Sequence, residues 1–175
     1  MDKNDIHNYV KNGIDENTIS KAIIEGWCLV CPNHAIKNEN DAVTYEKWDN
    51  VTKTKIKVTK KYYELSVKEK EEVISSNKDA CLTTSQIRNV FGELRRIQLN
   101  GYVKEKTTFL LIKPKLAYAV KRHKKKGLDM FYKLFCDAYD AIDFSDDNKG
   151  EIHFKNLMNL MEAVLAYHKY HGGRE

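Results

Sequence analysis

The sequence predicts an all-α protein, a compact helical bundle of about four to six helices. Three observations carry this prediction. The chain of 175 residues has only two prolines and eight glycines, too few for a loop-rich β-sandwich. From residue 83 onward, apolar residues recur every three or four positions between clear helix start and stop signals. The hydrophobic share of 42% is enough for one core.

The first 80 residues are expected to form an N-terminal extension with short helices. Asp15 is a suitable N-cap for a helix over residues 17–27. Pro32 then stops regular structure, since proline lacks the N–H that a helix interior needs.

Residues 33–50 are polar and predict a loop. Residues 51–58 partly alternate lysine with β-branched side chains, a weak strand pattern that a solvated helix or loop would explain equally well. Ser66 and Glu69 have the spacing of a capping box, which predicts a helix over residues 67–76.

Residues 81–175 are expected to form the bundle core and to carry its basic face. The first helix of this part begins at Thr83, which has capping-box spacing with Gln86, and Gly101 suits its C-terminal cap. The helix carries one apolar stripe, made of Ile87, Val90, Phe91, Leu94 and Ile97.

Pro114 interrupts the next helical segment. Proline fits the first turn of a helix and disrupts its interior. The sequence therefore indicates either a new helix that starts near Pro114 or a kinked helix over residues 108–125. Gly127 is expected to end that helix or to form a sharp turn.

Two further helices are predicted over residues 128–144 and 151–171. Both are amphipathic, and the polar sequence SDDNKG at residues 145–150 predicts the turn between them. Together with the two preceding helical segments, they can bury their apolar stripes against one another without any other element.

Positive charge is concentrated between Leu82 and Lys126. This window holds twelve Lys and Arg against two acids, Glu93 and Glu105, a net charge of +10, whereas the whole chain carries +5. Such segregation in a small chain is typical of a surface that binds a polyanion, most often a phosphate backbone.

The candidate nucleic-acid-binding residues of this window are Arg88, Arg95, Arg96, Lys113, Lys115, Tyr118, Lys121, Arg122 and Lys125. Arginine suits phosphate because its planar guanidinium presents a fork of donors. Tyr118 lies among cations and is interpreted as a stacking or packing residue. Contacts to the backbone are expected instead of base-specific contacts, because zinc-finger spacing, RNP-type sequences and GXXG loops are absent.

No metal or cofactor is predicted. Cys28 and Cys31 form a CxxC, and His34 adds a third possible ligand, but zinc needs a fourth. Reduced structural thiols are the preferred interpretation, because the first residues lack a signal-peptide pattern. No apolar run is long enough to span a membrane, so a cytoplasmic location is expected.

No catalytic residue is predicted, although two alternatives stay open. His123 could serve as the base of a metal-independent ribonuclease, but acid–base catalysis usually needs a titratable partner and a pocket. His168 and His171 are expected at the surface of the last helix. The second alternative is a helical protein–protein adaptor whose basic face meets an acidic partner.

Three sequence blocks occur in order, Leu82–Arg88 (LTTSQIR), Leu111–Ala119 (LIKPKLAYA) and Met161–Lys169 (MEAVLAYHK). Together they resemble the small subunit of type III-A CRISPR effector (Csm) complexes, the second protein of the Csm series, over roughly residues 80–171. Arg88 falls in the first block, and Lys113, Lys115 and Tyr118 fall in the second.

The resemblance implies a non-enzymatic helical bundle in an antiviral ribonucleoprotein. Its partners would be target RNA, the CRISPR guide RNA and other Csm subunits, with self-association of several copies in a stack and no membrane. The subunit would hold the phosphate backbone of the target RNA or of the guide–target duplex. Cleavage of the target RNA would belong to the neighbouring backbone subunit.

Overall fold

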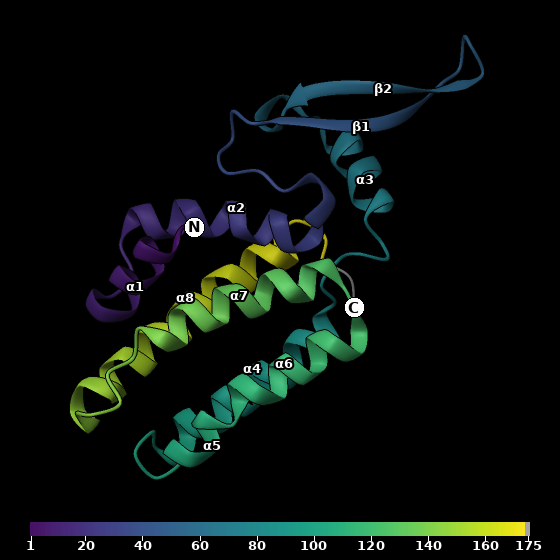
Figure 1. Cartoon of the computed structure of the whole chain (residues 1–175). Coiled ribbons are helices and arrows are strands. Elements are labelled where there is room, and N and C mark those ends of the chain that lie inside the picture. Colours follow the sequence, from purple (N-terminus) through teal and green to yellow (C-terminus); the bar gives the residue numbers. More distant parts are fainter. Residues whose placement is uncertain (174–175) are drawn as a thin grey trace.

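The protein is mostly helical but not all-α (Figure 1). We describe it from a computed structural model, over residues 1–173. The helices are α1 (Lys3–Asn12), α2 (Glu16–Val30), α3 (Val67–Ser76), α4 (Thr84–Asn100), α5 (Lys106–Leu110), α6 (Ile112–His123), α7 (Lys126–Asp140) and α8 (Asp147–Tyr170). The strands are β1 (Ala42–Asp49) and β2 (Thr54–Lys61). The described residues thus contain more helices than the four to six expected, and one small sheet.

The N-caps predicted at Asp15, Ser66 and Thr83 are confirmed, whereas α8 begins at Asp147, inside the stretch predicted as a turn over residues 145–150. The Asp15 carboxylate accepts a hydrogen bond from the Thr18 N–H at 2.7 Å and caps α2. Ser66 and Glu69 form the capping box of α3, whose bounds are those predicted. Thr83 caps α4 in the same way. Each cap satisfies N–H groups that have no partner inside the helix.

The loop predicted over residues 33–50 is wrong, because residues 42–49 form β1, which pairs antiparallel with β2. Residues 51–58, whose alternatives were open, lie partly in β2. Only Val43 and Tyr45 of β1 are buried, on the side facing α3. Two buried positions in a polar stretch are too few for a sequence pattern of period two to stand out.

Pro114 is the third residue of α6, so the alternative of a new helix near this proline is correct. The break falls at Leu111, between α5 and α6. The missing N–H of Pro114 costs nothing in a first turn. Gly101 ends α4 with a φ of 95°, a region that favours glycine.

The sharp turn after α6 is formed by Lys124, whose φ is 52°, and the prediction that Gly127 makes it is wrong. Gly127 lies in the first turn of α7, where its N–H donates to the Ala80 carbonyl at 2.8 Å. A Cβ at this position would lie 2.4 Å from the Leu82 nitrogen. The glycine is therefore required by the close approach of α7 to the segment before α4.

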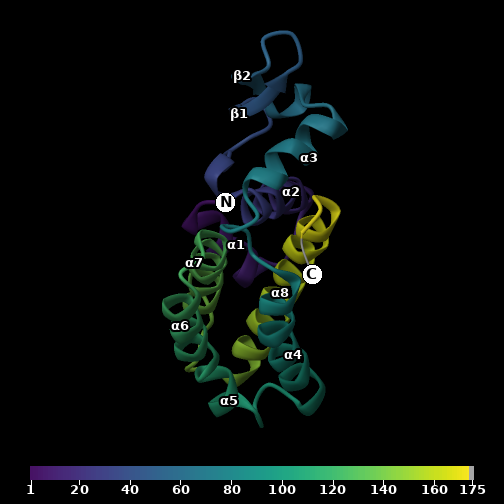
Figure 2. The same cartoon turned by 90° about the vertical axis from the view of Figure 1, so that its right-hand side faces the viewer.

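Helices α4, α6, α7 and α8 lie along one axis, with α5 at one end and α1 and α2 packed over α7 and α8 (Figures 1 and 2). The side chains of Ile6, Tyr9 and Val10 in α1 are buried in the same core as Phe131 of α7 and Leu157 of α8. The two N-terminal helices thus share the core of the part expected to begin at residue 81.

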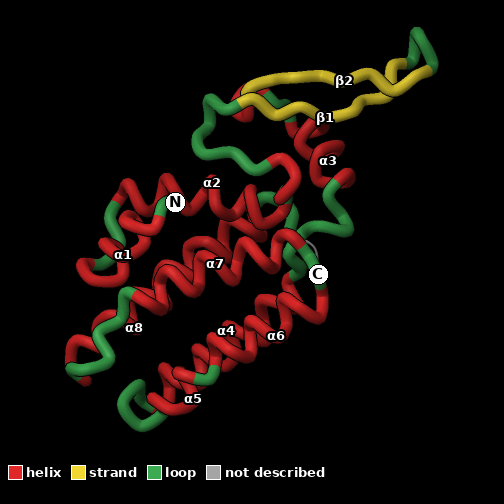
Figure 3. The backbone as a smooth tube through the Cα atoms, viewed as in Figure 1, coloured by secondary structure: helices red, strands yellow, loops and turns green. Residues whose placement is uncertain are grey.

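The hairpin β1–β2 and α3 form a separate structural layer, which projects beyond the helical body (Figure 3). A second apolar cluster joins this layer to α2. Trp27 of α2 lies in the cluster and contacts the ring of Tyr62, with centroids 5.0 Å apart. The hairpin is therefore anchored at its base while its turn extends outward.

Candidate nucleic-acid interface

The exposed face of α6 and the turn that follows carry a concentration of cations, which we call the basic ridge. It consists of Lys115, Tyr118, Lys121, Arg122, Lys124 and Lys125. Helix α6 buries Ile112 and Leu116. At about 100° per residue, Tyr118 and Arg122 lie roughly 100–140° around the helix from these buried residues, and Lys115, roughly 80° away, borders the apolar side. The Tyr118 side chain is 68% exposed. The ring therefore belongs to the surface and not to the core.

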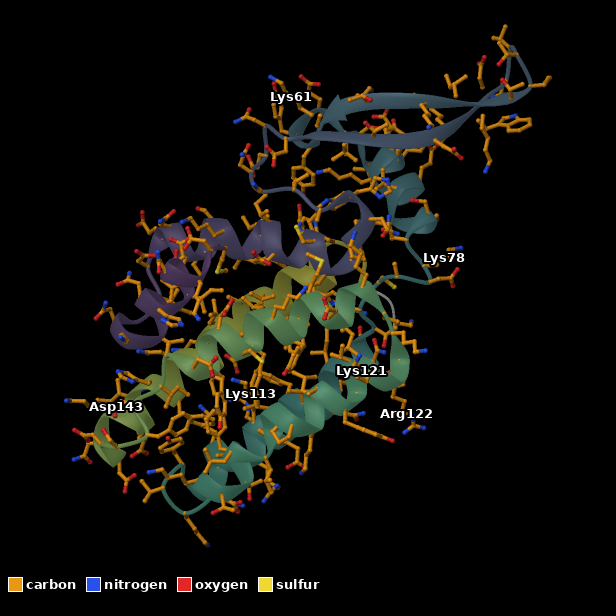
Figure 4. The ribbon with its side chains drawn as sticks, in the orientation of Figure 1. Lys61, Lys78, Lys113, Lys121, Arg122 and Asp143 are labelled. Atoms are coloured by element: carbon orange, nitrogen blue, oxygen red, sulfur yellow. The ribbon has the colours of Figure 1, made fainter. Side chains whose placement is uncertain are left out.

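The cations of the ridge are not neutralised within the described chain. None of the ion pairs formed within residues 1–173 involves Lys115, Lys121, Arg122, Lys124 or Lys125. Figure 4 shows Lys121 and Arg122 at the C-terminal end of α6, with Arg122 extending away from the helical body. These charges are available to an anionic partner.

Four lysines surround an open hollow at the corner between α6 and α7. Lys121, Lys124, Lys125 and Lys126 line it together with apolar groups and one acid, and its volume is about 620 Å³. That acid, Asp129, already pairs with Lys133 at 2.7 Å. A hollow lined by cations with little compensating charge concentrates anions, and this one has room for a phosphate group.

Two of the predicted arginines of α4, unlike the ridge cations, form ion pairs within the chain. Arg95 pairs with Glu162 of α8 at 3.0 Å, and Arg96 pairs with Glu93 at 3.3 Å and with Glu105 at 3.1 Å. The only two acids of the basic window are thus both used by Arg96. Exposed pairs of this kind stabilise little, but they offset part of the positive charge.

Lys113 is also engaged inside the chain. Its Nζ lies 2.5 Å from Asp140 Oδ1 and 5.3 Å from the centroid of the Tyr139 ring. The hydrogen bond to Asp140 raises the pKa of the Lys113 ammonium group. This lysine joins α6 to α7 and contributes less free charge than the ridge residues.

Arg88 is exposed on α4. The side of α4 that faces α6 carries Gln86, Asn89 and Glu93, and Arg88 and Arg95 lie roughly 130–155° around the helix from it. The structure therefore brings together Lys115, Tyr118, Lys121, Arg122 and Lys125, while Arg88 and Arg95 lie on another side of the molecule.

A groove of about 380 Å³ separates α4 from α6. Val90, Leu116 and Ala119 give it an apolar floor, and His123 and Glu93 lie at its polar edges. Because Glu93 and His123 are thirty positions apart along the chain, no local sequence pattern indicates that they share a groove. Within residues 1–173, His123 forms no hydrogen bond that would orient its imidazole.

The CxxC cysteines are buried. Cys28 Sγ donates to the Ile36 carbonyl at 3.2 Å, and burial raises the pKa of this thiol to about 11. The His34 ring nitrogen Nδ1 lies 2.8 Å from Asn77 Nδ2. Among the described residues, no three His, Cys, Asp or Glu side chains are grouped as metal ligands.

The prediction that His168 and His171 lie at the surface is wrong. Both are buried near the end of α8, where His171 Nε2 lies 3.0 Å from the Ile23 carbonyl. Because a carbonyl only accepts, this nitrogen carries the proton. Burial lowers the pKa of both imidazoles, to about 4 for His171. Their role is to join α8 to its neighbours.

No helix within residues 1–173 is both long and apolar enough to cross a bilayer. The architecture and the site together define a mostly helical protein with a basic ridge on one helix and its following turn.

Residues 60–174 match the family Csm2 Type III-A, and the chain belongs to that family. The resemblance drawn from the three sequence blocks is thereby confirmed. Membership points to the small subunit of a type III-A CRISPR effector and implies association with other Csm subunits. No curated protein and no solved structure matches the chain. The family match covers α3 to α8 and leaves α1, α2 and β1 outside.

Proposed function

We propose that this chain is a non-catalytic, RNA-binding subunit of a type III-A effector. It acts in the cytoplasm in antiviral defence and holds the phosphate backbone of target RNA or of the guide–target duplex. The proposal rests on the basic ridge, where Lys115, Lys121, Arg122 and Lys125 all lie on α6 or the turn after it and form no ion pair with another residue of 1–173.

Backbone contacts suit such a subunit. Base pairing with a guide RNA determines the sequence specificity. The protein therefore needs only a positively charged surface that fits the shape of a strand or duplex. The ridge runs along α6 from Lys115 to Arg122, about 10 Å at 1.5 Å per residue, and continues into the turn. A path of this length contacts a few phosphates.

A few contacts per subunit give weak binding, and self-association offsets this weakness. We propose that several copies stack, so that successive ridges follow one RNA. Each further copy then binds at a high effective concentration, and overall affinity rises without new kinds of contact.

The test compares two double charge reversals in the full chain. Lys121→Glu with Arg122→Glu removes ridge charge, whereas Lys11→Glu with Lys155→Glu makes the same change in net charge on exposed residues of α1 and α8. In fluorescence anisotropy with a labelled single-stranded RNA at low salt, we expect about a tenfold loss of affinity for the ridge variant. The control variant keeps affinity near the wild-type value.

Equal affinity of both variants would contradict RNA binding by the ridge. Competition distinguishes the adaptor alternative. If the ridge is a site for acidic proteins, polyglutamate should displace the labelled RNA as readily as unlabelled RNA of equal charge does. For the ribonuclease alternative, we expect labelled RNA to stay intact with the purified protein. Cleavage that disappears in His123→Ala would overturn the non-catalytic assignment.

Assembly is tested by co-expression with the other Csm subunits and a guide RNA. We expect the wild-type chain to enter one ribonucleoprotein particle in several copies, measured by native mass spectrometry. A particle that forms with a single copy would contradict stacking.

A further inference from the structure

The hairpin β1–β2 has an anchored base. Val43 and Tyr45 are buried against the second apolar cluster. The Tyr45 hydroxyl donates to Glu69 Oε1 at 2.9 Å, and Lys60 Nζ lies 2.7 Å from the same oxygen. This hydrogen bonding fixes the direction in which the hairpin leaves the helical body.

The outer part of the hairpin, residues 46–57, is here called the arm. It extends beyond α3, away from the bundle (Figures 1 and 3). Three large apolar side chains are exposed on it, Trp48 at 55%, Val51 at 88% and Ile56 at 41%. Exposed apolar groups gathered on one projecting element are typical of a binding surface.

The arm is also basic. It carries Lys47, Lys53, Lys55 and Lys57 against Glu46 and Asp49. Asp49 is occupied by its own turn, since its carboxylate accepts from the Thr52 hydroxyl at 2.6 Å and from two backbone N–H groups. These hydrogen bonds, led by that from Thr52, lower the pKa of Asp49.

Glu46 lies 3.6 Å from Lys55. Within residues 1–173, Lys47, Lys53 and Lys57 form no ion pair. The arm therefore presents positive charge that the chain itself does not neutralise.

The strand register places the aromatic group among these cations. Trp48 is opposite Lys55, and Glu46 is opposite Lys57. Side chains of directly paired residues lie on the same face of a sheet, and alternate residues of one strand share that face. The indole of Trp48 thus shares one face with Lys55 and Lys57, and Lys53 follows in the turn.

We propose that the arm is a second RNA-binding element, separate from the basic ridge. Trp48 stacks on an unpaired base of single-stranded RNA, and Lys53, Lys55 and Lys57 contact the flanking phosphates. Bases and phosphates alternate along a single strand, and an aromatic side chain bordered by cations matches this alternation. All of the arm, residues 46–57, lies outside the family match, which begins at residue 60, so the element belongs to this chain's own N-terminal part.

The test uses the full chain and a fluorescein-labelled oligouridylate. Trp48→Ala removes the stacking ring, and Trp48→Phe keeps one. Anisotropy is expected to show at least about a fivefold loss of affinity for Trp48→Ala, the lower end of base–aromatic stacking, and near wild-type affinity for Trp48→Phe. Lys53→Glu with Lys57→Glu should also weaken binding, relative to the charge-matched Lys11→Glu with Lys155→Glu.

Tryptophan emission gives a direct readout of stacking. The chain has two tryptophans, and Trp27 is fully buried. We expect oligouridylate to quench the wild-type emission and to leave the emission of Trp48→Phe unchanged. Far-UV circular dichroism and the melting temperature verify folding, which the exposed arm residues should not affect.

The proposal is overturned if Trp48→Ala and the lysine variant bind oligouridylate like the wild type, or if quenching persists in Trp48→Phe. It is also overturned if these variants lose a co-purified protein subunit while RNA affinity is unchanged, because the arm would then bind protein. The ridge variant Lys121→Glu with Arg122→Glu is measured in parallel, so failure of the arm and failure of the proposed function give different results.

Discussion

The imidazole of His168 donates a hydrogen bond to the main-chain carbonyl of Leu82, with Nε2 3.0 Å from the oxygen. The bond joins the end of α8 to the residue that precedes the cap of α4. Leu82 in turn donates its N–H to the Leu29 carbonyl at 3.0 Å. The block that contains Leu82 and the block that contains His168 therefore meet in the core. Part of the composition of these two blocks is thus explained by packing and not by charge.

The buried histidines make stability depend on pH. An unfolded histidine has a pKa near 6.5, whereas His171 in the fold has a pKa of about 4. Between these values the unfolded chain binds the proton first, so the free energy of unfolding falls as the pH is lowered. From pH 7 to pH 5 the loss from His171 is on the order of 2 kcal/mol. Urea unfolding across this range measures it.

His171→Phe supplies the matched variant for this measurement, with the exposed His123→Asn as control. The His171 variant should show a shallower slope of unfolding free energy against pH, whatever its absolute stability, and the control should keep the wild-type slope. Identical slopes in all three proteins would mean that His171 is not the group that titrates.

Two glycine substitutions should change stability in opposite directions. A Cβ at Gly127 would lie 2.4 Å from the Leu82 nitrogen and 2.9 Å from the Leu29 oxygen, whereas one at Gly92 in α4 meets no atom within 4 Å. We expect Gly127→Ala to destabilise by about 2 kcal/mol or more through overpacking. Gly92→Ala should stabilise by roughly 0.5–1 kcal/mol, the helix preference for alanine. Equal midpoints in urea would refute the close approach at Gly127.

Glu69 is expected to control the order of the hairpin. Its carboxylate accepts from Lys60, Tyr45 and Ser66, and these bonds, with that from Lys60 the largest, hold the pKa of Glu69 well below its usual range. Glu69→Gln removes the charge but keeps the shape.

Hydrogen–deuterium exchange should then be faster in the peptides of β1 and β2 and unchanged in α7 and α8. Glu71→Gln, on the same helix and exposed, is the control. Uniformly faster exchange over the whole chain would indicate global destabilisation and would contradict a local role for Glu69.

Local signals predicted the helices well, and tertiary contacts explain the failures. Capping boxes at Ser66 and Thr83 depend on residues three positions apart, so the sequence alone locates them. The hairpin depends on pairing between β1 and β2 and on burial against α3, which no local window contains. The requirement for Gly127 likewise arises from backbone atoms of Ala80 and Leu82, distant in sequence but adjacent in the fold.

The candidate site was predictable where helical spacing decides exposure. Lys115, Tyr118 and Arg122 share a face of α6 as their spacing predicts. Ion pairs to distant acids were not predictable, because Arg95 meets Glu162 and Lys113 meets Asp140 only after the helices pack. The sequence treats all these cations alike, while the structure divides them into paired and unpaired groups.

This division predicts different salt dependences of RNA binding for two variants. Lys121→Gln with Arg122→Gln removes unpaired ridge charges, and each lost phosphate contact should reduce the slope of log affinity against log salt by about 0.7 for single-stranded RNA. Arg96→Gln removes a cation already paired with Glu93 and Glu105. The slope of log affinity against log salt for this variant should therefore fall by less than the value of about 0.7 expected for one lost phosphate contact. Anisotropy titrations at a series of salt concentrations measure both slopes. Because exposed ion pairs are weak, RNA could displace them. An Arg96 variant that loses as much slope per charge as the ridge variant would therefore place the RNA path across α4 as well as α6.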